Sequence, residues 1–487
     1  MLRVKRTPDE IRAALPLLPS AAENAIMAGS DGRNAQMRDN GEKALARAIA
    51  ADVAAAGGRV YYVGGVVRDA CMGVESKDVD VEVYGILPAQ LREILARHGE
   101  VYEKGASFGV LGLRHSDLDV AMPRRERRTG EGHRDFDVSV DPFLSTREAS
   151  MRRDFTINAM MRDVLTGEVI DHWGGQSDLQ ARIIRCVNEK TFPEDALRVF
   201  RAAQFAARLN AQIEERTLAL CREINVEAIS PERIFEEMKK ALLKAEHPSV
   251  FFRELRRMDH LKEFFPELER CASVPQNPAF HPEGGVFEHT MLVVDCAAAL
   301  RERAVEPLGF MLSALLHDLG KCVATKVDED GRITSIGHET LGLELVETQM
   351  RRWTNNTKLI RYVLNQTQLH MRPNLLACFH SKKKKTRQLF DLSVCPEDLI
   401  LLSRADASGK LDAPYNEENE IFLRERLEDY RAVLARPMVT GRDLIEAGVR
   451  PGEDMKALLQ RARMLHFSGI ERKNALKQVL AEYKCIK

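Results

Sequence analysis

Apolar and polar residues follow two different periods along this chain. Up to about residue 122, short apolar runs such as RVYYV at residues 59–63 alternate with helical patterns, one of which begins at Pro88. Beyond about Met151, apolar residues recur at three- and four-residue spacing, in segments that follow a proline or a capping residue. The patterns predict an α+β head with a small mixed sheet, followed by an all-helical remainder of the chain.

The same patterns predict where the elements lie. In the head we expect helices over residues 41–56 and 88–98, and strands over residues 59–63, 78–84, 109–113 and 117–122. A short hairpin is expected in GEVIDHWGG, within the region that is otherwise helical. In the helical part we expect helices over residues 193–209, 231–245 and 248–265, a loop near residue 380 and a last helical unit over about 440–487.

A chain of 487 residues exceeds the size of one hydrophobic core, so we expect two or more domains. Residues 1–42 show no clear period and are predicted to be an N-terminal extension. The changes in pattern then predict a head over 43–165, a helical neck over 166–275, a second helical domain over 276–415 and a helical tail over 416–487.

The composition excludes several classes of protein. The 72 Lys and Arg residues balance 73 Asp and Glu residues, so the net charge does not indicate a nucleic-acid partner. Nine cysteines without a C-x-x-C pair indicate reduced thiols in a cytoplasmic protein. Charges between Asp9 and Arg12 interrupt the N-terminal apolar stretch, and no run reaches the roughly 18–20 residues of a membrane span, so we expect no membrane insertion.

The segment KDVDVEVYG predicts an acidic strand. Successive side chains of a strand point to opposite faces, so Asp78, Asp80 and Glu82 are expected to share one face and the intervening valines to pack on the other. Carboxylates this close repel one another unless a cation lies between them. Mg²⁺ is commonly shared between carboxylates and substrate phosphates, so we expect Asp78 and Asp80 to be catalytic and to bind Mg²⁺.

The D-x-D spacing alone is not specific, because an amphipathic strand can direct acids to solvent and the spacing recurs at Asp117 and Asp119. The residues upstream distinguish the first copy. Gly64 and Gly65 allow backbone N–H groups to approach a triphosphate closely, and Arg68 adds positive charge at the start of the next helix. We therefore expect these three residues to bind a nucleotide.

Three motifs in this order resemble the nucleotidyltransferase superfamily, in the form used by class II CCA-adding enzymes and bacterial poly(A) polymerases. The motifs are VGGVVRD with KDVDVEVYG, then MRRDFTINAM, then PEDALRVFRAAQFAARL, and the similarity covers about residues 58–270. The resemblance implies template-independent addition of CCA to the 3′ end of tRNA from CTP and ATP, with release of pyrophosphate.

The resemblance also implies roles for single residues. Arg153 and Arg201 would hold the triphosphate, which suits bidentate guanidinium chemistry, and Asn158 would shape the turn after the second motif. The family often has a further arginine one helical turn after Arg201, where this chain has Gln204. A fourth arginine contact is therefore not expected.

Asp195 and Arg198 are candidates for selecting the base. Their i, i+3 spacing predicts that they share one face of a helix, where a carboxylate that only accepts lies beside a guanidinium that only donates. Cytosine and adenine present a donor beside an acceptor and fit this pair, whereas guanine and uracil present the opposite order. The resemblance agrees, because class II enzymes read the incoming base with side chains at these motif positions. A surface salt bridge is the alternative.

Two basic runs are candidates for contacts with an RNA backbone. They are RRERR at Arg124–Arg128 and KKKK at Lys382–Lys385. A run of charges is also typical of a solvated surface, so the pattern leaves both interpretations open.

The C-terminal half contains a possible metal site. His289, His317, Asp318 and Asp406 occur in the order H, HD, D on successive predicted helices. Imidazoles and carboxylates from facing helices can converge on one divalent ion and leave a position open for water or phosphate. The set resembles the HD phosphohydrolase superfamily.

Similar HD domains are fused to the CCA-adding enzymes of some bacteria, where they act on 2′,3′-cyclic phosphates and other phosphoesters. The resemblance thus implies a hydrolase with a divalent transition metal such as nickel, manganese or iron. His338 and His370 would complete a second metal position.

Several alternatives stay open from the sequence. The chain could add only CC or only A, or it could be a poly(A) polymerase, although it ends without the strongly basic tail of such enzymes. It could be an inactive RNA-binding module, and the HD domain could serve only to support tRNA. The sequence carries no signal for an oligomeric state.

Overall fold

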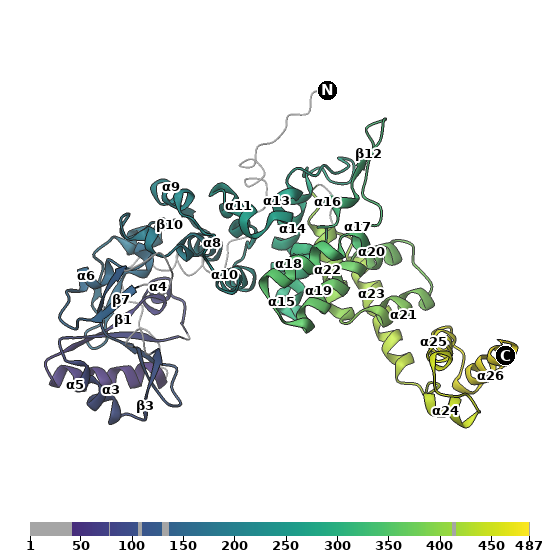
Figure 1. The fold of residues 1–487 in the computed structure, drawn as a ribbon, viewed down its shortest axis with the longest axis horizontal. Helices are drawn as coiled ribbons and strands as arrows, with labels where there is room; N and C mark the ends of the chain where they lie inside the picture. The colour runs from purple at the N-terminus through teal and green to yellow at the C-terminus, as the bar shows by residue number, and fades with distance from the viewer. Residues whose placement is uncertain (1–40, 77, 106–109, 129–135, 412–414, 487) are drawn as a thin grey trace. The chain divides into compact units, whose positions relative to one another are not determined.

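The structure of this chain, a computed structural model, describes residues 41–76, 78–105, 110–128, 136–411 and 415–486 (Figure 1). Contacts within the chain define two compact units. The first unit comprises the head up to Arg198 together with Gln212–Leu220. The second comprises Val199–Ala211 and the chain from Cys221 onward. The predicted extension lies outside the described residues except for its last two positions.

A seven-stranded mixed sheet forms the head. Its strand order is β3-β4-β5-β2-β1-β8-β9, in which β2 and β5 are parallel and the other neighbours are antiparallel. The strands are β1 (Arg59–Val63), β2 (Asp80–Tyr84), β3 (Val101–Gly105), β4 (Val110–Leu113), β5 (Asp119–Ala121), β8 (Met161–Asp163) and β9 (Val169–Ile170). The predicted α+β head with a mixed sheet is confirmed.

One face of this sheet packs into an apolar core. The side chains of Val79, Val81 and Val83 are at most 1% exposed and belong to the same core cluster as residues of α3 (Gly41–Ala55) and α5 (Pro88–Ala96). Figure 1 shows the two helices together beside the sheet. Because the valine face is buried, the strand register is fixed and its acids lie on the opposite face.

The opposite face of the sheet is covered by shorter elements. Tyr61, Tyr84 and Met161 form a smaller core there with Ala149 of α6 (Thr146–Ser150). The other elements of this unit are α4 (Gly65–Cys71), the ribbon of β6 (Arg124–Arg128) and β7 (Phe136–Val140), η1 (Thr156–Asn158), α7 (Gly175–Gln180), β10 (Ile183–Ile184), η2 (Phe192–Glu194) and β11 (Gln212–Ile213). Two helices, α8 (Leu197–Leu209) and α9 (Glu215–Glu223), each begin in the first unit and end in the second.

Packed helices make up the second unit. A first group consists of α10 (Pro231–Lys244), α11 (Ser249–Arg257), α12 (Leu261–Phe264), α13 (Pro266–Cys271), α14 (Val286–Ala298), η3 (Arg301–Arg303) and α15 (Pro307–Leu316). A second group consists of α16 (Lys321–Ala324), α17 (His338–Leu341), α18 (Leu343–Trp353), α19 (Thr357–Leu369), α20 (Met371–Cys378), α21 (Lys383–Leu392), α22 (Pro396–Ser408) and α23 (Glu417–Leu434). Within them, α14 packs against both α15 and α22.

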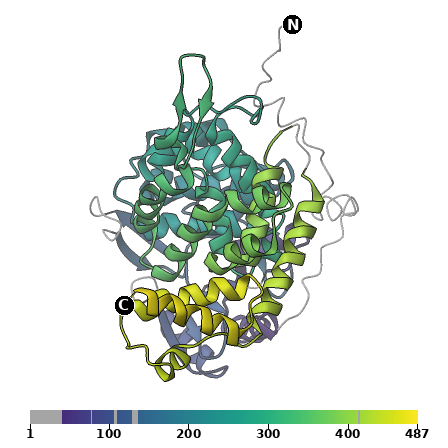
Figure 2. The same cartoon turned by 90° about the vertical axis from the view of Figure 1, so that its right-hand side faces the viewer.

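A hairpin and a helical tail extend from these helices. The hairpin of β12 (Lys326–Val327) and β13 (Ile333–Thr334) projects from them in both views (Figures 1 and 2). The tail consists of α24 (Gly441–Glu446), α25 (Glu453–Phe467) and α26 (Arg472–Ile486), and Figure 2 shows α25 and α26 side by side in yellow. Arg387 of α21 donates to the carbonyl of Phe467, which ties the tail to the preceding helices. Among the described residues, no helix combines the length and apolar character that crossing a bilayer requires.

Three details differ from the expected elements. The predicted helix over 248–265 is divided into α11 and α12, because Asp259 adopts a left-handed φ of 61°. The predicted loop near residue 380 is short, since α21 begins at Lys383 and most of the lysine run is helical. The predicted hairpin in GEVIDHWGG is present as β9, but its partner is the preceding strand β8.

Candidate active sites

The acidic strand has the predicted alternation. Asp80 and Glu82 lie on the face opposite the buried valines, and Asp78 lies two residues before the first position of β2 rather than within it. Burial raises the pKa of Asp80, repulsion by Asp119 and Asp78 adds to this rise, and Arg153 opposes it. A carboxyl group in this setting gains from a cation that neutralises it, which fits a Mg²⁺ site.

Asp119 is a site residue that the sequence did not reveal. Strand β5 runs parallel to β2, and Asp119 is the direct neighbour of Asp80 in the register. Lys104 of β3, which is separated from β5 by β4 in the sheet, pairs with its carboxylate. The second D-x-D, Asp117 and Asp119, was not expected to be part of the site. Its Asp119 nevertheless lies beside Asp80, because the pairing of β5 with β2 brings the two residues together.

The glycine turn precedes α4 as predicted. Gly64 has a φ of 70°, a conformation that side chains with a Cβ rarely adopt, and Gly65 is the first residue of α4. A Cβ at Gly64 would lie 3.9 Å from Arg153 Nη1, so the turn faces this arginine closely. The binding of a phosphate group at this turn stays a prediction.

Arg68 is not a solvent-facing charge at the start of the helix. Its side chain is buried, its Nη1 donates to Asn158 Oδ1 at 2.7 Å, and its Nε donates to Asp69 Oδ1 at 2.9 Å. Asn158 in turn donates to Asp154 Oδ1 at 3.1 Å. Burial requires this pairing of the guanidinium. Arg68 therefore links the helix after the glycine turn to the second motif, and the shaping role expected of Asn158 stays a prediction.

The expectation that Asp195 and Arg198 share a helical face is wrong. Asp195 is extended and precedes α8, because Pro193 lies in the short helix η2 and the Asp195 carboxylate accepts from the backbone N–H of Leu197. Arg198 lies in the first turn of α8 and donates through Nη1 to Thr191 O and through Nη2 to the carbonyl of Arg152, both at 2.8 Å. The two side chains thus come from a turn and a helix.

Two further residues of the third motif lie in the second unit. Arg201 Nη1 is 3.8 Å from Glu237 Oε1, and its guanidinium lies over the ring of Phe205. Gln204 is 1% exposed.

The two basic runs have different surroundings. Arg125 of RRERR is exposed and pairs with Asp141 at 3.0 Å, and the side chains from residue 126 to residue 128 lie outside the described ones. Lys383 of the lysine run pairs with Asp429 at 2.8 Å. Their contact with RNA stays a prediction.

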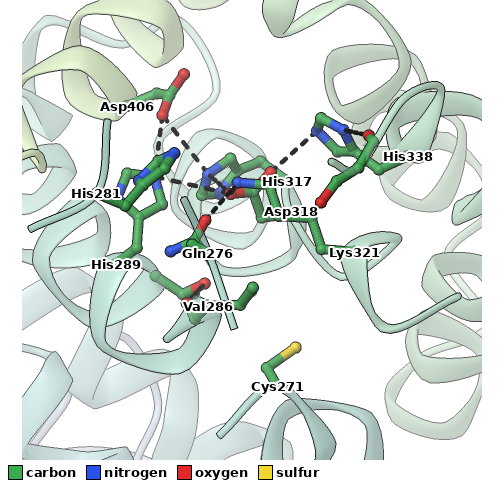
Figure 3. Close-up of polar contacts among 12 residues, drawn as sticks. Cys271, Gln276, His281, Val286, His289, His317, Asp318, Lys321, His338 and Asp406 are labelled. Atoms are coloured by element: carbon green, nitrogen blue, oxygen red, sulfur yellow. Dashed lines mark hydrogen bonds and ion pairs between the residues drawn. The ribbon is translucent and has the colours of Figure 1, made fainter. Parts of the chain in front are cut away.

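A cluster of four histidines and two aspartates lies in the second unit: His289, His317, His338, His370, Asp318 and Asp406. Figure 3 labels all of them except His370. Each histidine has its Nδ1 atom fixed by an acceptor. The acceptors are the Glu283 carboxylate for His289 and the backbone carbonyls of Ala314, Ser335 and Thr367 for His317, His338 and His370, at 2.7–2.8 Å. Because a carbonyl oxygen only accepts, Nδ1 carries the proton, and Nε2 is left as the ligand atom.

The Nε2 atoms converge on the two aspartates. His289 Nε2 is 3.1 Å from Asp406 Oδ1, and His317 Nε2 is 3.3 Å from Asp318 Oδ2. His338 Nε2 is 3.0 Å from Asp318 Oδ1, on the other side of the same carboxylate. Asp318 therefore lies between two groups of candidate ligands, one with His289 and His317 and one with His338 and His370.

The donor set fits a divalent transition metal. His317 Nε2 is fully buried and has no hydrogen-bond partner among the described residues, which is costly unless an ion accepts its lone pair. The hydrogen bonds to Asp406 and Glu283 outweigh burial and raise the pKa of His289 to about 9, so a metal that binds Nε2 would have to displace a proton from it. Burial lowers the pKa of His370 to about 4, which keeps it in the neutral form that a metal requires.

Four neighbours of this cluster were not predicted. Glu283 accepts from His289 and also contacts His281 Nδ1 at 2.9 Å. Lys321 Nζ is 2.6 Å from both Asp318 Oδ2 and Gln276 Oε1. A carboxylate that accepts from the second ring nitrogen of a metal-binding histidine orients that ring. The sequence signal for Glu283 is therefore an acidic residue shortly before His289, the first histidine of the cluster.

Family models match the chain in three places. A poly A polymerase head domain matches residues 60–185, a model described as the probable RNA and SrmB-binding site of polymerase A matches 210–271, and an HD domain matches 286–408. The acidic strand and glycine turn lie in the first match and the histidine cluster lies in the third. Together these observations define a nucleotidyltransferase that carries an HD domain.

Curated relatives define the family more closely. The multifunctional CCA protein of Alkalilimnicola ehrlichii is 36% identical over 421 residues, which cover 83% of this chain and 98% of the relative. The multifunctional CCA protein of Pseudomonas aeruginosa is 34% identical over 425 residues, with 83% and 97% covered. The chain belongs to the multifunctional CCA protein family.

Solved structures of low identity share the fold. The CCA-adding enzyme of Bacillus stearothermophilus in complex with CTP has a TM-score of 0.65 at 22% identity, covering 92% of this chain and 99% of the other. The Thermotoga maritima CCA-adding enzyme complexed with tRNA has a TM-score of 0.59 at 20% identity, covering 93% and 99%. At this identity the likeness concerns the fold alone.

Proposed function

We propose that this chain adds CCA to the 3′ end of tRNA from CTP and ATP, in the cytoplasm, and releases pyrophosphate. The observation that carries the proposal is the convergence of Asp80, Asp119 and the Gly64 turn beside Arg153, on one face of the sheet of a multifunctional CCA protein family member. The relatives described above are multifunctional CCA proteins, so the alternative of a poly(A) polymerase is not favoured.

Asp78 and Asp80 are the proposed Mg²⁺ ligands, with Asp119 as a third carboxylate beside them. Mg²⁺ would supply activation of the tRNA hydroxyl and neutralisation of the leaving pyrophosphate. Arg153 holds the triphosphate, and Gly64 and Gly65 let it approach the backbone. The triphosphate contact that the resemblance implies for Arg201, which belongs to the second unit, stays a prediction. Arg68 acts indirectly, because it fixes this turn through Asn158.

Asp195 and Arg198 are the proposed base-selecting pair. A guanidinium has five N–H donors, and the terminal nitrogens of Arg198 use only some of them on backbone carbonyls, so it can still donate to N3 of cytosine or N1 of adenine. The Asp195 carboxylate accepts from the exocyclic amino group. The carbonyl contacts hold the Arg198 side chain in place. Because it cannot move to suit another base, a mismatched base would leave polar groups of the base and of the protein unpaired.

Replacing Asp195 by alanine is expected to relax base selection more than it weakens tRNA binding. We expect the preference for CTP over UTP to fall from roughly 10⁴-fold to about 10²-fold or less, because the acceptor for the amino group is lost. The measurement is the ratio of kcat/KM for the two nucleotides on a tRNA that ends before its CCA. Glu194→Gln, which changes the adjacent acid, serves as the matched control, and unchanged selectivity in Asp195→Ala would refute the base-reading role.

For the HD domain we propose metal-dependent hydrolysis of a phosphoester at a tRNA 3′ end. His289, His317, Asp318 and Asp406 hold one divalent transition metal, and His338 and His370 add a second position around Asp318. The metal would supply polarisation of the phosphate and activation of a water molecule. Glu283 keeps the His289 ring oriented.

A further inference from the structure

Glu82 is a buried acid that the proposed transfer reaction does not use. It lies on β2 two residues after Asp80 and on the same face, and its side chain is 1% exposed. A buried carboxylate is costly unless charged or hydrogen-bonded partners satisfy it. Glu82 has such partners on both of its oxygens.

The carboxylate of Glu82 is held in one orientation. Its Oε2 accepts from the hydroxyl of Tyr84 at 2.6 Å, and the Tyr84 ring packs edge-on against Tyr61 with the ring centroids 5.4 Å apart. Tyr61 is also the direct neighbour of Glu82 in strand β1. Because the aromatic pair is buried, Oε1 is left facing the second motif, where it is 3.1 Å from Arg152 Nη2 and 3.8 Å from Arg153 Nη2.

Arg153 lies between Glu82 and the catalytic acids. One terminal nitrogen faces Glu82, and the other would be 3.9 Å from a Cβ at Gly64. Its charge also acts on Asp80, where it opposes the rise in pKa that burial causes. If Glu82 lost its charge, the guanidinium would be free to pair with Asp80, and the site would lose a phosphate contact and a metal-binding carboxylate together.

Arg152 connects Glu82 to the base-selecting residues. Its guanidinium is bound by Glu82, and its carbonyl accepts from Arg198 Nη2 at 2.8 Å. One carboxylate therefore anchors both residues of an Arg-Arg pair. Arg152 supports Arg198, which is proposed to read the base, and Arg153 is itself proposed to hold the triphosphate.

We propose that Glu82 is a positioning residue for the incoming nucleotide: it holds Arg153 over the glycine turn and away from Asp80, and it fixes Arg152 beneath Arg198. The inference rests on the proposed function, because the nucleotide contacts of Arg153 and Arg198 belong to it. It assigns to this acid a role distinct from metal binding.

The test is the binding of CTP with Mg²⁺, measured by titration calorimetry on the full chain, together with KM values for CTP and tRNA. Glu82→Gln keeps the shape of the side chain and removes its charge. We expect the Kd and KM for CTP to rise about 10-fold, as for the loss of a charged hydrogen bond, with the KM for tRNA unchanged. Tyr84→Phe, which removes only the hydroxyl that orients Glu82, is expected to give a smaller rise.

A matched control separates positioning from general stability. Asp178 is another buried acid of the same unit, and it is bound by Thr156 Oγ1 at 2.7 Å and Arg185 Nε at 3.1 Å rather than by the arginines of the second motif. Asp178→Asn is expected to lower the melting temperature and to leave the Kd for CTP unchanged. A double-mutant cycle adds a second control, because Glu82→Gln should have little effect on CTP binding once Arg153 is alanine.

The outcomes distinguish the inference from the function on which it rests. If the wild-type chain binds and transfers CTP but Glu82→Gln has the same Kd for CTP, the positioning role is refuted alone. The positioning role is also refuted if the effects of Glu82→Gln and Arg153→Ala on the Kd for CTP are additive. If the wild-type chain neither binds nor transfers CTP, the proposed function fails and the inference fails with it.

Discussion

Replacing Asp78 by alanine is expected to abolish nucleotide transfer while the fold stays intact. Asp78 lies at the entrance of β2 beside Asp80, and removal of one carboxylate leaves the cation site with too little negative charge. We expect a loss of roughly 10³-fold or more in kcat, the scale of losing a principal electrostatic contact to the transition state. The measurement is single-turnover extension of a tRNA that lacks its 3′ CCA.

Asp117→Ala is the matched control for this prediction. Asp117 belongs to the second D-x-D of the chain but is exposed, so its loss is expected to leave transfer close to the wild-type rate. The melting temperature and any hydrolase activity of Asp78→Ala should also equal those of the wild type. Full transfer activity in Asp78→Ala would remove the metal assignment.

Replacing His317 by alanine is expected to abolish metal-dependent phosphoesterase activity and to reduce the metal content of the protein. His317 is fully buried, its Nδ1 contacts the Ala314 carbonyl, and its Nε2 lies 3.3 Å from Asp318 Oδ2 without a hydrogen-bond partner among the described residues. Loss of a residue that supports a metal ligand typically lowers metal affinity or activity by roughly 10–100-fold. We expect a larger loss when the ligand His317 itself is removed. The measurements are metal analysis and hydrolysis of a 2′,3′-cyclic phosphate with nickel, manganese or iron.

His247→Ala provides the control for the HD prediction, because this histidine is partly exposed and pairs with Asp295 outside the cluster. It is expected to keep both metal and activity, and His317→Ala is expected to keep nucleotide transfer. A wild-type chain that binds no divalent metal and hydrolyses no phosphoester would contradict the hydrolase proposal. The HD domain would then be a support for tRNA.

The acidic strand shows how much of the head could be predicted from its sequence. The alternation of valines and acids predicted which face is buried, because strand periodicity is a local property. The approach of Asp119 to Asp80 depends on the parallel pairing of β2 with β5, which no local pattern encodes. Arg68 was expected to face a ligand, but burial and the distant Asn158 turn it inward.

The histidine cluster was predicted in part for the same reason. The order of His289, His317, Asp318 and Asp406 indicated a shared metal, since the residue types themselves carry the chemistry. Glu283 was missed because its role depends on the distance to His289 in the folded chain. For Asp195, the spacing suggested a helix, whereas Pro193 and the N–H of Leu197 place it in a turn before α8.

The central claim is CCA addition, and one measurement tests it most directly. The purified chain is incubated with Mg²⁺, CTP, ATP and a tRNA transcript that lacks its 3′ CCA, and product length is resolved to single nucleotides. We predict extension by three nucleotides that then stops. Extension by one or two nucleotides, a long adenosine ladder or no extension would contradict the account.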